Sequence, residues 1–162
     1  MVKPTSKVYV NVYPEIIVGS MLSVFKKILV PLDGSENASH ALNKAVQIAK
    51  KFDGKIMLIN VYWISAFRLT PAQLVDYVVD IRKAGEEILT DGKKVVQAEG
   101  IPVESILKEG HIVEEILKTA KEGNYDLIVM GARGVSKIRE ILLGSVSYGI
   151  TAHAPCPVLI VK

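Results

Sequence analysis

Residues 131–147 read GARGVSKIREILLGSVS and directly follow an apolar run that ends at Met130. The length of that run, residues 125–130, and its lack of alternation predict a strand buried on both faces of a parallel sheet. The stretch contains three glycines and two late hydroxyls: Gly131, Gly134, Gly144, Ser145 and Ser147. Glycine lets the backbone approach a ligand closely, and free amides at a helix start favour an anion. The stretch therefore predicts phosphate binding by the backbone, with an ordinary strand-to-helix loop as the alternative.

The composition is that of a single globular domain. The chain has 162 residues, of which 49% are hydrophobic, enough for one core. A net charge of +3 with only 6% aromatic residues gives no indication of nucleic-acid binding. The single cysteine, Cys156, excludes an internal disulfide, so we expect an inert thiol and a cytoplasmic protein. No run approaches the roughly 18 apolar residues of a membrane span.

Apolar runs alternate with helical periodicity from residue 26 onward. The predicted strands span residues 27–32, 55–62, 103–108, 125–130 and 158–161. The predicted helices span about 35–52, 71–98, 110–121 and 145–153. In the second of these helices the predicted core stripe, interrupted by Gly85 and Gly92, is Leu74, Tyr77, Val78, Ile81, Ala84, Ile88, Val95 and Val96. This alternation predicts an α/β fold with an open, doubly wound, five-stranded parallel sheet, a Rossmann-like arrangement in the order 3-2-1-4-5.

That strand order predicts where a ligand would bind. The sheet reverses direction between its first and fourth strands, and ligands bind at such a switch point, beyond the carboxyl ends of the strands. The loops at that place are residues 31–35 and 131–137. Topology and glycine spacing therefore predict the same crevice.

The two ends of the chain raise a separate question. Residues 1–23 form an N-terminal extension that differs from the regular pattern, and Met21 is an alternative start. The last strand, residues 158–161, lies at an edge of the assumed sheet and is almost wholly apolar, and an uncovered edge of that kind invites aggregation. We expect a homodimer through this strand, with coverage of the edge by the N-terminal segment as the alternative.

Five stretches in the expected order resemble the universal stress protein family, specifically its ATP-binding branch. They are residues 26–35, the pair Asn60 and Val61, residues 126–134, residues 144–147 and residues 155–161. The family motif of two glycines three apart, a third glycine ten residues later and then a serine or threonine is met by Gly131, Gly134, Gly144 and Ser145. The resemblance covers residues 24–162, which we therefore expect to form one adenine-nucleotide-binding domain.

The resemblance implies a role for each matching residue. Pro31 and Asp33 would lie by the adenine and ribose, and the backbone of Val61 would contact the adenine. Residues 131–137 would wrap the ribose and phosphates, and the segment from Ser145 to Ser147 would hold the phosphate tail. The complete implied binding set is Pro31, Asp33, Val61, Met130, Gly131, Arg133, Gly134, Lys137, Gly144, Ser145, Val146 and Ser147. A divalent ion, Mg²⁺ or Mn²⁺, bridging the phosphates fits this chemistry.

Each of these residues also has a purely structural interpretation. Asp33 could cap the first helix, Ser145 and Ser147 could cap the last one, and Arg133 and Lys137 could be solvated loop bases. The chain has neither the Gly-x-x-x-x-Gly-Lys-Ser/Thr nor the Gly-x-Gly-x-x-Gly fingerprint, and no general base is evident.

The leading hypothesis is therefore a nucleotide-dependent stress or signalling switch with little or no hydrolysis of its own and an unidentified protein partner downstream. The alternatives are a slow stand-alone ATPase and an interaction module that binds no nucleotide.

Overall fold

The computed structural model describes residues 9–11, 25–64, 70–135 and 143–162. The strands are β1 (Tyr9–Asn11), β2 (Lys27–Pro31), β3 (Lys55–Tyr62), β4 (Val103–Glu109), β5 (Leu127–Gly131) and β6 (Val158–Val161). The helices are α1 (Glu36–Phe52), α2 (Pro71–Ala98), α3 (Ile112–Glu122) and α4 (Ser145–His153). Apart from β1, these are the elements that the apolar periodicity predicts, with ends that differ by one or two residues.

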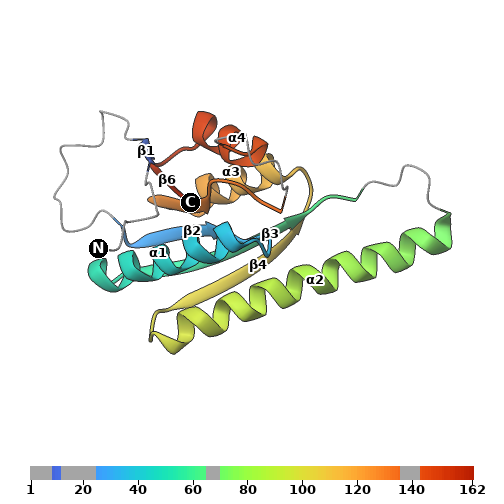
Figure 1. The fold of residues 1–162 in the computed structure, drawn as a ribbon, viewed down its shortest axis with the longest axis horizontal. Helices are drawn as coiled ribbons and strands as arrows, with labels where there is room; N and C mark the ends of the chain where they lie inside the picture. Colours follow the sequence, from blue (N-terminus) through green and yellow to red (C-terminus); the bar gives the residue numbers. More distant parts are fainter. Residues whose placement is uncertain (1–8, 12–24, 65–69, 136–142) are drawn as a thin grey trace, which may run out of the picture.

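The strands form one sheet in the order β1-β6-β5-β2-β3-β4 (Figure 1). The five strands from β2 to β6 are parallel to one another, which confirms the predicted order and the Rossmann-like α/β class. The central strand β2 pairs with β3 on one side and with β5 on the other. The loops that follow β2 and β5 are therefore neighbours at the carboxyl end of the sheet.

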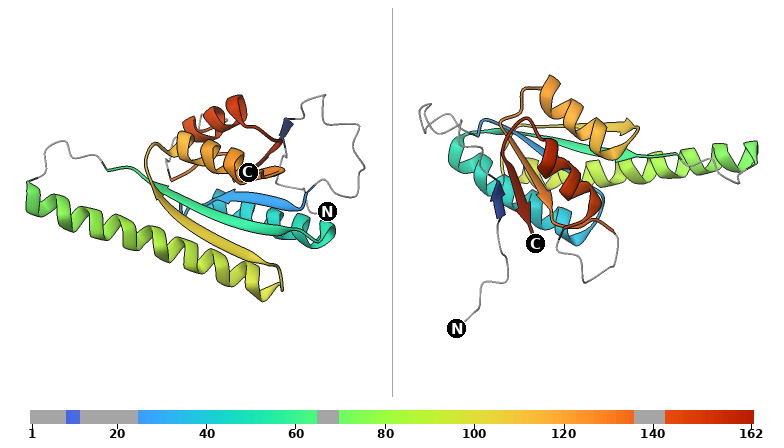
Figure 2. Two further views of the ribbon diagram at one scale, coloured as in Figure 1. Left: turned by 180° about the vertical axis from the view of Figure 1, so that it is seen from behind. Right: turned by 90° about the horizontal axis from the view of Figure 1, so that it is seen from above.

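Helices cover both faces of the sheet, α1 and α2 on one and α3 and α4 on the other (Figure 2). The strand residues alternate between the two cores. Val30 and Leu58 pack with Ala45 of α1 on one face, whereas Leu29 and Ile59 pack toward α3 and α4 on the other. Both faces of the central strands are buried, as their continuous apolar runs predict.

Asp126 fastens β2 to β5 at the end of the sheet away from the predicted crevice. Its carboxylate accepts hydrogen bonds from the backbone N–H of Lys26 at 3.0 Å and of Lys27 at 3.1 Å. Burial raises the pKa of Asp126 above its ordinary value, although the backbone N–H groups of Lys27 and Lys26 act in the opposite direction. The two strands that carry the predicted site are thus tied together at their starts.

The apolar edge strand β6 is covered by the chain's own N-terminal segment. β1 pairs with β6 in antiparallel register, with Val10 opposite Leu159 (Figure 1). The structure therefore has the arrangement that we considered as the alternative to a homodimer at this edge. The homodimer itself stays a prediction.

Helix α2 is longer than the sheet it packs on. It has 28 residues, begins with a capping box between Thr70 and Gln73, and its first half extends beyond the strands (Figures 1 and 2). Its buried residues are Gly85, Leu89, Gly92 and Val96. The predicted stripe is wrong at Tyr77, Ala84 and Val95, which are exposed. In the part of the chain that the structure describes, no helix has the length and apolarity needed to cross a bilayer.

Candidate functional site

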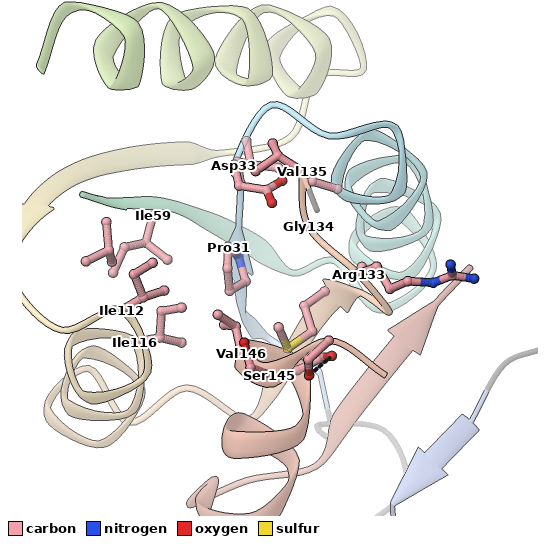
Figure 3. A pocket seen from close by; sticks show the side chains of 17 residues that line it. Pro31, Asp33, Ile59, Ile112, Ile116, Arg133, Gly134, Val135, Ser145 and Val146 are labelled. Atoms are coloured by element: carbon pink, nitrogen blue, oxygen red, sulfur yellow. Dashed lines mark hydrogen bonds between the residues drawn. The ribbon is translucent and has the colours of Figure 1, made fainter. Parts of the chain in front are cut away.

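A pocket of about 410 Å³ opens at the carboxyl ends of β2 and β5, where the strand order reverses. Eleven of the twelve predicted binding residues line it (Figure 3). They are Pro31, Asp33, Val61, Met130, Gly131, Arg133, Gly134, Gly144, Ser145, Val146 and Ser147. The twelfth, Lys137, lies outside the described residues. Residues from four separate elements and two loops therefore meet in one cavity, while their roles in binding stay a prediction.

One wall of the pocket is apolar and was not predicted as part of the site. Ile59 of β3 and Ile112 and Ile116 of α3 face Pro31 across the cavity (Figure 3). Ile112 and Ile116 are four residues apart, so they share one face of α3. That spacing marked them as core residues, and nothing in the sequence showed that the core face of α3 also reaches the pocket. This wall suits a flat, weakly polar group such as a nucleobase.

The loop after β2 is held by side chains at the pocket's edge. Asn60, which is buried in β3, donates a 2.7 Å hydrogen bond from Nδ2 to the carbonyl of Leu32. Asp33 accepts the backbone N–H of Ser35 through Oδ1 at 3.0 Å, and Ser35 is the N-cap that accepts from Ala38. Ser35 rather than Asp33 therefore caps α1. The hydrogen bond to Ser35 fixes the Asp33 carboxylate at the mouth of the pocket.

The three glycines of the motif differ in how much space surrounds them. A Cβ atom on Gly131 would lie 2.8 Å from Cβ of Asn37 and 2.9 Å from its carbonyl carbon, so glycine there allows β5 to end against α1. A Cβ atom on Gly134 would lie 2.3 Å from Oδ2 of Asp33. At Gly144 the nearest atom would be 3.5 Å away, an ordinary contact. Packing therefore requires glycine at position 131 and leaves room for a side chain at position 144.

The start of α4 forms another side of the pocket, next to α3 (Figure 3). Gly144 is the N-cap, no side chain caps the helix, and no acidic residue lies in its first turn. The first backbone N–H groups of a helix have no partner within it and carry partial positive charge, so they bind anions. Ser145 and Val146, in the first turn of α4, line the cavity (Figure 3).

Ser147 has a structural role that the sequence did not distinguish from ligand binding. Ser147 is 2% exposed, and its hydroxyl donates toward the carbonyl oxygens of Ala132 at 2.7 Å and Gly144 at 2.9 Å, which share its one proton. The backbone N–H of Gly144 also donates to Ala132 at 2.8 Å. These bonds attach the glycine loop to α4, so Ser147 would contribute to phosphate binding through its backbone.

Two charged side chains lie at the pocket, one acidic and one basic. Asp33 is the one carboxylate among its described lining residues. The guanidinium of Arg133 extends outward from the loop, away from Pro31 and Ser145, and the Arg133 carbonyl accepts a 3.3 Å hydrogen bond from Asn37 (Figure 3). Within the described ranges, no three His, Cys, Asp or Glu side chains gather as metal ligands.

Comparisons with known proteins agree with this geometry. The universal stress protein family matches residues 25–162. The universal stress protein YxiE of Bacillus subtilis is 35% identical over 148 residues, which cover 86% of this chain and all of the relative.

Solved structures give the same result. The universal stress protein UspA from Lactobacillus plantarum superimposes with a TM-score of 0.74 at 28% identity, over 85% of this chain and 98% of that one. A universal stress protein solved in complex with cAMP superimposes with a TM-score of 0.67 at 28% identity, over 86% of this chain and 99% of that one. With the fold and the motif residues in their expected places, this chain belongs to the universal stress protein family.

Proposed function

We propose that the protein binds ATP in the pocket between β2 and β5 and acts as a nucleotide-dependent switch in stress response or signalling. The observation that carries the proposal is the meeting, in one cavity, of an apolar wall, the glycine loop and the uncapped start of α4. A solved relative holds an adenine nucleotide, cAMP, which supports the same ligand class.

The pocket suggests how ATP would lie in it. The adenine would pack on Ile59, Ile112 and Ile116, with the backbone of Val61 and the side chain of Pro31 beside it. The ribose would lie near Asp33 and Gly134. The phosphates would reach the N–H groups of Ser145 to Ser147, with Mg²⁺ or Mn²⁺ bridging their oxygens.

Hydrolysis by the protein alone is expected to be slow or absent. The one carboxylate in the described lining, Asp33, already accepts the N–H of Ser35 and lies on the side of the pocket where we place the ribose. A general base must lie within hydrogen-bond reach of the attacking water at the terminal phosphate, and Asp33 does not meet that requirement in this orientation. A nucleotide that persists unhydrolysed could set the shape of the pocket loops and hence the choice of a protein partner in the cytoplasm.

Isothermal titration of nucleotide-free protein with ATP, ADP, AMP and GTP in the presence of magnesium tests the proposal. We expect micromolar binding of ATP and its loss in Gly144→Val, because a position with room for a Cβ accepts valine but places methyl groups at the phosphates. Circular dichroism of the variant checks that it folds. Absence of binding by folded wild-type protein would leave an interaction module, and rapid phosphate release would favour a stand-alone ATPase.

A further inference from the structure

A second cavity, of about 460 Å³, lies beside the first. It is lined by Trp63, His111, Ile112, Val113, Ser145 and Val146. Three of these residues, Ile112, Ser145 and Val146, also line the first pocket. The two cavities therefore adjoin each other at Ile112 and the start of α4.

One wall of the second cavity is aromatic and does not belong to the hydrophobic core. Trp63 comes directly after the last residue of β3 and is 56% exposed. Its ring meets the His111 ring edge-on, with centroids 6.2 Å apart and planes at 77°. Because the rings are nearly perpendicular, the imidazole does not stack flat on the indole. A flat ring that covered the exposed indole face would therefore bind favourably.

The two helix starts at the second cavity differ in charge. The start of α4 has no acidic residue in its first turn, whereas the first turn of α3 carries Glu114 and Glu115. Glu115 forms a 3.3 Å ion pair with Lys108, and Glu114 lies 3.9 Å from His111. An anionic group is therefore favoured at α4, between the two cavities, and an uncharged ring is favoured beside Trp63 and His111.

We propose that the second cavity binds the second nucleoside of a dinucleotide, in which two nucleosides are joined through a chain of phosphates. The inference rests on the proposed function, since the first nucleoside occupies the ATP pocket. The phosphate chain crosses the start of α4, and the second base stacks on Trp63. Stacking of a base on an aromatic side chain strengthens binding by about ten- to a hundredfold.

The chain contains a single tryptophan, so its fluorescence reports on Trp63 alone. Full-length protein is titrated with ATP, adenosine tetraphosphate and diadenosine tetraphosphate, each with magnesium, and followed by both fluorescence and calorimetry. Adenosine tetraphosphate separates the effect of added phosphate from that of the second base. We expect diadenosine tetraphosphate to bind at least about tenfold tighter than both mononucleotides and to be the one that quenches Trp63.

The substitution Trp63→Leu keeps an apolar side chain and removes the stacking surface. We expect it to abolish the advantage of diadenosine tetraphosphate while leaving the affinity for ATP unchanged. Tyr77→Leu is the matched control, because it replaces another exposed aromatic residue on α2 that lines neither cavity, and it should change neither affinity.

The outcomes separate this inference from the proposed function. ATP binding with no advantage for diadenosine tetraphosphate, or an advantage that survives Trp63→Leu, overturns the dinucleotide site and leaves the ATP site standing. Equal quenching of Trp63 by ATP also overturns it, because a mononucleotide would then reach the second cavity. Failure of every nucleotide to bind overturns both.

Discussion

Oδ2 of Asp33 occupies the space next to Gly134 where a side chain would begin, with only 2.3 Å between that oxygen and a Cβ atom built on the glycine. The two residues belong to different loops, one after β2 and the other after β5. Their contact joins the two sides of the pocket mouth, so the orientation of the carboxylate depends on the absence of a side chain at position 134.

Gly134→Ala should therefore weaken ATP binding without unfolding the protein. The added methyl group meets the end of a side chain, which can rotate away, but rotation costs Asp33 its hydrogen bond with the N–H of Ser35. We expect at least about a tenfold loss of affinity by calorimetry, equivalent to about 1.4 kcal/mol. If the effect acts through the carboxylate, Gly134→Ala in an Asp33→Ala background should cost nothing further. Additive losses would contradict this relationship.

Gly131→Ala should destabilise the fold more than Gly144→Ala. At position 131 the methyl group would meet the backbone of Asn37 in α1, and overpacking of this kind costs about 1–3 kcal/mol. At position 144 the nearest atom is 3.5 Å away, so the only expected cost is that of alanine in place of glycine at the N-cap, less than about 1 kcal/mol. Urea unfolding of the two variants side by side measures the difference, and equal stabilities would contradict the packing role of Gly131.

The stability of the protein should fall in alkaline solution, in part through Cys156. Burial raises the pKa of the Cys156 thiol from an ordinary value of 9.0 to about 11. Between these values the unfolded chain has released the thiol proton and the folded chain has kept it, so the free energy of unfolding decreases as the pH rises. The contribution of one such group is up to about 1.4 kcal/mol per pH unit.

Urea unfolding of wild type and Cys156→Ala at a series of pH values between about 8 and 11 isolates that contribution. The pKa values of Tyr62 and Tyr125 are also raised by burial, but both tyrosines are present in both proteins, so their effect cancels. The variant should show a shallower decrease. Parallel curves would mean that the thiol titrates in the folded protein as it does in the unfolded chain.

Removal of residues 1–20 should promote self-association. The deletion takes away β1 and leaves the backbone groups of β6 without their antiparallel partner along an apolar edge. Light scattering should show a larger species for the chain that begins at Met21 than for the full chain. Deletion of residues 1–6, which retains β1, is the matched control. The same size in all three cases would contradict the role of β1 as a cover for this edge.

Much of the fold follows from the sequence because each parallel strand is a short apolar run bounded by turn residues. The burial of α2 did not follow so directly. Helical periodicity predicted core residues along its whole length, but the first half extends beyond the sheet (Figure 1), and Tyr77 in that half is exposed. Periodicity also gave no packing role to Gly92, which is buried and lies so close to the sheet that a Cβ atom there would be 2.7 Å from Cδ1 of Leu32. Such close helix-to-sheet approach depends on the register between distant elements.

The candidate site also has parts that could be predicted from the sequence and parts that could not. The glycine loop and the start of α4 are contiguous in sequence and could be predicted from it. The apolar wall could not, because Ile112 and Ile116 look like any other core residues until the path of α3 across the pocket is known. Nothing in the sequence shows that the rings of Trp63 and His111 lie side by side, because 47 residues separate them in the chain.

The switch point also determines when the pocket can exist during synthesis of the protein. The ribosome releases β2, α1, β3, α2 and β4 first, and these can pair in sequence order. Pro31 and Asp33 are therefore in place long before Gly131 and Ser145 emerge. β5 must then insert beside β2, its partner about a hundred residues earlier in the chain. A nascent chain thus has half a pocket for most of its synthesis, and the cavity is complete only when the C-terminal half has been made and has joined the sheet.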